Sequence, residues 1–431
     1  MRRIRPLLGF VAILAAPCTV LARDSDRDVD AGEPASSSAP PKPFELRDRD
    51  RVVFLGNALI ERELPFAYVE AALTQAHPLR TISFRNLGWS GDDVTGRARV
   101  GFDPPERGFA LIEARLRESA PTVVVLAYGS NESFDGRAGL ESFLTGFARI
   151  LALVDALGAR AIILSPLRHE DLGRPLPDPA EHNRDLALYV DALRELAEKR
   201  GDVFVDLFAP LGAQSATDPR VLLTDNGIHL TAYGYWRFAQ HLASSLGARI
   251  SRWSIDVDLE RGSIAADGTR FRGARLGSDG VRFAAVDLAL PWSPIPGDAP
   301  DGAARVAGRR LRIQGLAPGR WVVEADGRVI ASDDAESFAR GLDLKDDPAI
   351  ARVEQLRRTI ARKNFLFFCK WRPQNDTYLF LFRKHEQGDL ASEVDQFEPL
   401  IAVEEARIAE LRVPVEVSYV VRRATAEESA R

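Results

Sequence analysis

The chain has 431 residues, of which 45% are hydrophobic, and a formal net charge of -5 at pH 7. This length is enough for two or three domains with apolar cores, and the negative charge argues against nucleic acid as the partner. With only Cys18 and Cys369, the composition excludes a disulfide-rich fold.

Residues 1–22 have the pattern of a secretory signal peptide. A basic segment, Arg2–Arg5, precedes the apolar run Leu7–Ala16, and Val20-Leu21-Ala22 is a small-residue cleavage site. The sequence therefore predicts an exported protein, periplasmic or extracellular. A membrane anchor is the alternative, but the apolar run is shorter than the roughly 20 residues that a spanning helix needs. Lipidation at Cys18 is a minor option.

Cleavage after residue 22 would change both the charge and the cysteine content. It removes three arginines and no acid, so the net charge falls from -5 to -8, and Cys369 remains as the single cysteine. The mature chain is expected to have no stable membrane span, no intramolecular disulfide and no nucleic-acid partner.

Residues 23–50 are charged and then rich in serine and proline, which predicts a disordered linker. From residue 51 to 248, short apolar runs alternate with amphipathic segments, a pattern that indicates a parallel sheet covered by helices on both faces. The predicted strands are Val52–Leu55, Thr81–Asn86, Thr122–Ala127, Ala161–Ser165 and Val203–Asp206; the predicted helices lie near Ala67–Gln75, Ala110–Glu118, Leu140–Leu157, Glu181–Lys199 and Gly234–Leu246.

The alternation ends near residue 250. Residues 251–345 carry short alternating strands such as Arg309–Gln314 and Arg320–Ala325, the latter followed by the hairpin turn Asp326-Gly327, and predict a small β-rich module. Residues 346–431 are predicted to form a helical C-terminal region, with helices over Pro348–Arg362 and Ser392–Leu411.

Four polar segments follow predicted strands or precede the last predicted helix of the α/β domain. Because the carboxyl ends of parallel strands meet at one edge of a sheet, we expect these segments to converge there. They offer a backbone amide at Gly91, a side-chain amide at Asn131 and an imidazole at His229, which together could form an oxyanion hole and a general base. The segments are Gly56-Asn57-Ala58, Asn86–Asp93, Tyr128–Ser133 and Thr224–His229.

The same segments resemble the motif blocks of the SGNH (GDSL-like) hydrolases, over roughly residues 51–246. The family's Gly-Asp-Ser-Leu block stands here as Gly56-Asn57-Ala58-Leu59, its oxyanion glycine as Gly91, and its Gly-x-Asn-Asp block as Gly129-Ser130-Asn131-Glu132. The resemblance implies a flavodoxin-like three-layer α/β/α fold, with Gly91 and Asn131 in the oxyanion hole and His229 handling protons. It implies no cofactor and no metal.

Two positions depart from the family pattern. Ala58 occupies the place of the nucleophilic serine, and a methyl group cannot attack an ester. In the family's Asp-x-x-His block the acid position, three residues before His229, holds Asn226, while Asp225 lies one place further back. Asn226 could orient the imidazole, and Asp225 could replace the acid if the Asn-Gly turn bulges.

Each candidate also has a structural interpretation. Gly91 could serve only as a turn glycine, Asn131 could tie loops together and His229 could simply precede a helix. Three hydroxyls could act as substitute nucleophiles, and four acids with His229 could bind a hard cation, although no ligand spacing specifies one. The hydroxyls are those of Ser90, Ser130 and Thr95; the acids are Asp92, Asp93, Glu132 and Asp225.

More distant residues allow two interpretations each. His169 and Glu170 follow a predicted strand and either line the cleft or belong to a solvated loop, and Trp371 is either a sugar platform or part of the core. Asn183 and Tyr189 are expected to fix their helix to the preceding loop.

Two functions are therefore open. One is an exported ester hydrolase of the SGNH type, acting on an acyl or acetyl ester, possibly of a carbohydrate, with a water or another hydroxyl in place of the serine. The other is a non-catalytic relative, a pseudoenzyme, that binds a glycan or an acylated small molecule.

Overall fold

The α/β domain is built on a parallel sheet. The computed structural model describes residues 44–217, 222–248, 252–299, 308–386, 388 and 390–429. Within these, five parallel strands have the spatial order β2-β1-β3-β4-β5, the doubly wound order of flavodoxin-like folds. The fold class expected from the sequence is confirmed. The strands are β1 Arg51–Gly56, β2 Ser83–Asn86, β3 Val123–Ala127, β4 Arg160–Leu164 and β5 Val203–Val205.

Alternate residues of these strands face two separate cores. Val52 and Phe54 of β1 pack with α2, α6 and α7, whereas Val53 and Leu55 pack with α3, α4 and α5. Burial on both faces explains why the strands are continuous apolar runs. The helices are α1 Ala58–Glu61, α2 Tyr68–Ala76, α3 Gly108–Ser119, α4 Gly136–Ala156, α5 Ala180–Arg200, α6 Phe208–Thr217 and α7 Ala232–Ser245, with 3₁₀ turns η1 Arg97–Arg99, η2 Pro105–Arg107 and η3 Glu132–Asp135.

The end of the predicted linker belongs to the folded domain, which corrects the boundary expected at residue 50. Leu46 is buried in the core beside α2 and α7, and Phe44 packs against the same cluster. The Asp50 carboxylate accepts hydrogen bonds from Thr122 Oγ1 at 2.7 Å and Arg160 Nη2 at 2.5 Å. The burial of Leu46 and Phe44 and the Asp50–Arg160 ion pair hold this segment on the domain, although the residues around them are polar. The predicted signal peptide and the rest of the linker lie outside the described residues.

The β-rich module contains two sheets around one apolar core. In the described part of the chain their orders are β13-β10-β6-β7 and β12-β11-β14-β9-β8. Asp326 and Gly327 have φ of 48° and 79° and join β11 to β12, so the hairpin expected there is confirmed. The elements are β6 Trp253–Asp258, β7 Ser263–Asp267, β8 Thr269–Gly277, β9 Gly280–Asp287, β10 Arg309–Gln314, β11 Arg320–Ala325, β12 Arg328–Asp334, α8 Ala335–Arg340 and β13 Leu342–Asp343.

The C-terminal region is not wholly helical, contrary to expectation. Strand β14, Glu416–Arg423, inserts between β11 and β9 of the β-rich module. Its alternate residues Val417, Tyr419 and Val421 bury one face of the strand in the core of that module. The described segment before it contains α9 Pro348–Trp371, α10 Asp376–Leu379, η4 Ala391–Gln396 and α11 Phe397–Leu411, and α12 Ala426–Ser429 follows it.

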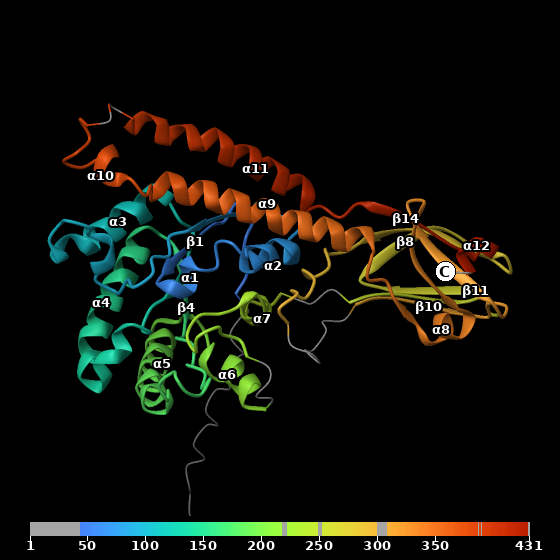
Figure 1. The fold of residues 1–431 in the computed structure, drawn as a ribbon, viewed down its shortest axis with the longest axis horizontal. Coiled ribbons are helices and arrows are strands. Elements are labelled where there is room, and N and C mark those ends of the chain that lie inside the picture. Colours follow the sequence, from blue (N-terminus) through green and yellow to red (C-terminus); the bar gives the residue numbers. More distant parts are fainter. Residues whose placement is uncertain are drawn as a thin grey trace, which may run out of the picture. The chain divides into compact units, whose positions relative to one another are not determined.

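Helices α9 and α11 lie side by side and antiparallel (Figure 1). Helix α9 continues past the predicted end at residue 362 and takes in the aromatic segment Phe365–Phe368, since no proline or glycine interrupts it before Pro373. It packs on the α/β domain, where buried Lys363 Nζ lies 2.7 Å from Glu70 Oε1 of α2. None of the described helices combines the length and apolar character needed to cross a membrane.

Candidate functional site

The turn after β1 places Ala58 at the start of helix α1. A Cβ atom at Gly56 would lie 2.5 Å from the carbonyl oxygen of Ala127 on the neighbouring parallel strand β3, so only glycine fits at this position. Asn57 caps the helix, its Oδ1 accepting a hydrogen bond from the Leu59 amide at 3.3 Å. The Asn57 Nδ2 atom is buried and, among the described residues, has no hydrogen-bond partner. The half-buried Ala58 follows directly.

The loop that carries Gly91 is fastened to β1 and α1. The Trp89 amide donates to the Gly56 carbonyl at 2.9 Å, and the Ser90 amide donates to the Glu61 carboxylate. Gly91 has a φ of +79°, which favours glycine, and a Cβ atom there would meet no atom within 4 Å. Its backbone therefore borders open space beside α1.

Asn131 is tied to the Gly91 loop. Its Nδ2 donates to the Asp92 carbonyl at 2.6 Å, which uses one of the two amide hydrogens. The neighbouring Glu132 carboxylate accepts from the Gly129 amide at 2.8 Å and the Val94 amide at 2.9 Å, and burial raises the pKa of Glu132 to about 7. The loops after β2 and β3 are thus cross-linked, and one Asn131 N–H remains for another acceptor.

Asp92 anchors these loops through a buried ion pair. Its Oδ2 lies 2.6 Å from Arg99 Nε, and the Tyr128 hydroxyl is 3.2 Å from the same oxygen. Burial raises the pKa of Asp92 despite the adjacent guanidinium. The acids considered above as cation ligands are thus engaged elsewhere, and no group of three or more His, Cys, Asp or Glu side chains in the described residues is arranged to hold a metal ion.

Asn226 contacts the His229 ring directly. Its Oδ1 accepts from the backbone amides of Ile228 at 3.2 Å and His229 at 2.9 Å, which fixes the orientation of the side-chain amide. Its Nδ2 therefore faces His229 Nδ1, at 3.0 Å. An amide nitrogen can only donate, so Nδ1 accepts and the neutral ring carries its hydrogen on Nε2. Burial and the charge of Arg62 lower the pKa of His229.

Asp225 faces a different partner. Its Oδ2 lies 3.6 Å from Arg62 Nη2, at the end of α1, and only its backbone amide bonds to His229, at the carbonyl oxygen 3.0 Å away. No hydrogen bond joins the Asp225 carboxylate to the His229 ring within the described structure. The contacts around Glu61, Arg62 and Asn131 nevertheless link all four candidate segments to α1, directly or through one neighbour.

Comparison with known proteins assigns the domain. Residues 61–237 match the model of the GDSL-like lipase/acylhydrolase family, a span that holds Gly91, Asn131, Asn226 and His229. This part of the chain is therefore similar to the GDSL-like lipase/acylhydrolase family. The match begins three residues after Ala58. No curated protein matches the chain.

Solved structures resemble the chain at low sequence identity. A gut microbial diltiazem-metabolizing enzyme is 17% identical, with a TM-score of 0.70 over 88% of this chain and 99% of that one, so the likeness extends beyond the GDSL-like domain. A catalytic mutant of an acetylxylan esterase from Geobacillus stearothermophilus is 17% identical (TM-score 0.40; 48% of this chain, 98% of that one). A putative GDSL-like lipase from Parabacteroides merdae is 14% identical (TM-score 0.40; 48% and 100%).

A histidine and aromatic cluster, formed by Phe134, His169 and His182, borders the GDSL-like site. The Phe134 and His182 rings stack with centroids 3.9 Å apart, and those of His169 and His182 are 4.7 Å apart. Burial lowers the pKa of His169 to about 4, with contributions from His182 and His229. His169 lies in the loop after β4 but is half-buried, because its ring packs against those of His182 and Phe134. Sequence reasoning missed Phe134 and His182, which no motif marks.

Asn183 and Glu170 hold this side of the GDSL-like domain together. Asn183 brackets the backbone of His169 with two hydrogen bonds of 2.9 Å and so fixes α5 to the preceding loop, as expected. Tyr189 does not contact that loop: its hydroxyl lies 2.8 Å from the Glu132 carbonyl and 3.0 Å from the Gly136 carbonyl. The Glu170 carboxylate accepts from the Leu223 amide at 3.0 Å and the Thr224 amide at 2.8 Å. Glu170 thus positions the segment that carries Asn226 and His229.

The substitute hydroxyls are not paired with the candidate base His229. Thr95 Oγ1 donates to Asp93 Oδ1 at 2.5 Å, and within the described residues no hydrogen bond joins Ser90, Ser130 or Thr95 to His229. Trp371 is 6% exposed and packs edge-on against Trp89, with centroids 5.8 Å apart, which supports its interpretation as core.

Proposed function

We propose that the GDSL-like domain binds a ligand bearing an acyl or acetyl ester, such as an acetylated carbohydrate, without hydrolysing it by the serine route. The observation that carries the proposal is the hydrogen bond from Asn226 Nδ2 to His229 Nδ1, 3.0 Å long, in a chain that has Ala58 at the serine position of the family pattern. The serine that would give up the proton and the acid that would orient the imidazole are therefore both replaced, by Ala58 and Asn226.

The position of the imidazole proton distinguishes binding from general-base catalysis. A serine hydrolase needs Nδ1–H held by an acid and a free lone pair on Nε2 that accepts the hydroxyl proton. Here Nδ1 accepts from Asn226, so Nε2 carries the hydrogen and acts as a donor. Protonation would set an Nδ1–H against the Asn226 NH₂ group, in keeping with the lowered pKa of His229. His229 therefore suits hydrogen bonding to a ligand better than general-base catalysis.

The remaining groups are donors suited to a carbonyl oxygen. We assign to this role the Gly91 amide, the free Asn131 N–H and His229 Nε2–H, by analogy with the family's oxyanion hole. The Gly91 loop borders open space, and Asn131 is bound to that loop through the Asp92 carbonyl. Hydrogen-bond donors fixed in place before the ligand arrives bind an ester carbonyl at little reorganisation cost.

A set of variants tests the proposal with 4-nitrophenyl acetate. We expect no His229-dependent hydrolysis by the parent, little by Ala58→Ser, and at least about 10²-fold more by Ala58→Ser/Asn226→Asp, since the correct imidazole tautomer is worth up to about 10⁴ in serine enzymes. The His229→Ala version of the double variant should lose this gain. Binding without turnover is checked by titrating the parent with acetanilide, an uncleaved analogue, and following the His229 ring resonances.

Two results would reject parts of the proposal. Parental hydrolysis that disappears in His229→Ala would show an enzyme. Equal activity of Ala58→Ser and the double variant would refute the tautomer argument.

A further inference from the structure

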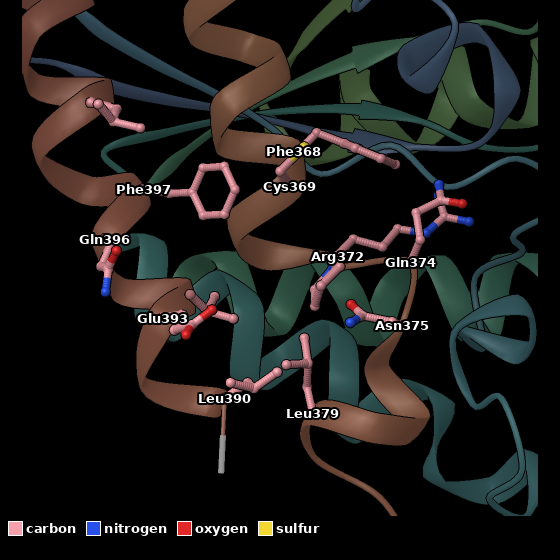
Figure 2. Close-up of a pocket in the computed structure, with 13 residues that line it drawn as sticks. Phe368, Cys369, Arg372, Gln374, Asn375, Leu379, Leu390, Glu393, Gln396 and Phe397 are labelled. Carbon is pink, nitrogen blue, oxygen red and sulfur yellow. The ribbon is translucent and has the colours of Figure 1, made fainter. Parts of the chain in front are cut away.

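A pocket of about 470 Å³ lies in the C-terminal region, outside the site described above. It is enclosed by the end of α9, by α10, by η4 and by the start of α11 (Figure 2). This volume is in the range of sites for drug-sized ligands. No motif predicted it, because its walls come from residues 368–400 that carry no recognisable pattern.

The walls of the pocket are mainly apolar. Phe397 projects from α11 toward α9 (Figure 2). The other large apolar side chains of the lining are Phe368, Leu379, Leu390, Val394 and Leu400. Leu400 is 49% exposed although it lines a concave surface. Large apolar side chains left open to solvent in a concavity indicate a place where a ligand buries apolar area.

Two charged side chains line the pocket, and they differ in their partners. Arg372 is already neutralised: its Nη1 lies 3.0 Å from Glu61 Oε2, and its guanidinium stacks 3.5 Å from the Trp89 ring centroid. Glu393 is exposed and, within the described residues, forms no ion pair and no side-chain hydrogen bond. The unbalanced charge of the pocket is therefore negative.

We propose that this pocket binds a hydrophobic organic cation, a molecule with an apolar body and an ammonium group. The apolar body would fill the space between α9 and α11, and the ammonium would pair with Glu393. The ring of Phe397 adds a favourable interaction with a cation, whereas the Phe368 ring already has the Arg372 guanidinium 5.6 Å from its centroid. This inference does not depend on the function proposed for the GDSL-like domain, although Arg372 joins the pocket wall to Glu61 and Trp89.

Cys369 provides a direct probe, because it lines the pocket and the sequence has one other cysteine, Cys18. In a Cys18→Ser background, alkylation of Cys369 by N-ethylmaleimide is measured with increasing 4-phenylbutylamine or 4-phenylbutyrate, which share an apolar body and carry opposite charges. We expect the amine to protect Cys369 at a concentration about tenfold lower than the acid does.

Glu393→Gln should abolish this preference, whereas Asp395→Asn, an exposed change on the same 3₁₀ turn outside the lining, should preserve it. The proposal is overturned if neither compound protects, if both protect equally or the acid protects better, or if Asp395→Asn has the same effect as Glu393→Gln. The last result would show a diffuse charge effect instead of a site.

Discussion

The two halves of the candidate site are built differently. The donor half, the loops that carry Gly91 and Asn131, is anchored by Asp92 and Arg99, whose side chains are 0% and 2% exposed. The histidine half, residues 222–230, buries Leu223 and Leu230 in the core but exposes its polar turn, and its Asp225–Arg62 pair is 52% and 43% exposed. Changes at the anchor of the donor half therefore disturb folding, whereas the exposed turn at Asp225 and Asn226 can change with little effect on stability. This contrast fits a domain that keeps its binding groups while its proton-transfer groups differ from the family pattern.

The largest effect is expected from breaking the anchor of the donor half. Arg99→Met leaves the Asp92 carboxylate buried without its cation, and removing one partner of a buried pair costs about 3–5 kcal/mol. Urea unfolding followed by tryptophan fluorescence measures the loss. The control is Arg97→Met, since Arg97 is 74% exposed and 3.9 Å from Asp93, a contact worth less than about 1 kcal/mol. Similar losses in both variants would refute the contrast between the halves.

A smaller, pH-dependent effect is expected at Glu132. Burial raises its pKa from 4.5 to about 7, so between these values the folded state binds more protons at this site than the unfolded state. Its contribution to the free energy of unfolding therefore falls as the pH rises through this window and is constant above it. Glu132→Gln removes this term, so the variant should gain stability relative to the parent from pH 4.5 to 7. Parallel curves for the two proteins would contradict the assignment.

The sequence predicted what depends on local pattern. The valine and isoleucine runs gave the parallel sheet, and Asp326-Gly327 gave a hairpin. Contacts between distant residues could not be predicted: β14 pairs with β9 and β11 only once the chain has returned from α11, and the core position of Leu46 depends on α7. In the site, the motif identified Asn226 and His229, but the direction of the proton between them follows from the two backbone amides that orient the Asn226 side chain.

The smallest effect on stability, and the sharpest on chemistry, is expected from Asn226→Asp. The new carboxylate can keep both backbone hydrogen bonds of the exposed turn, so unfolding should change by no more than about 0.5 kcal/mol. At the His229 ring, the carboxylate replaces a hydrogen-bond donor by an anion. The anion stabilises the imidazolium and so raises the pKa of His229, and in the neutral ring it holds the hydrogen on Nδ1. Ring ¹⁵N shifts measured against pH report both changes. The control Asp225→Asn removes a charge that raises the His229 pKa, and should lower it further. An unchanged tautomer in Asn226→Asp would mean that the parent His229 already carries its hydrogen on Nδ1 and has a lone pair on Nε2. The histidine half would then not differ from the family pattern in the way that the Asn226 hydrogen bonds indicate.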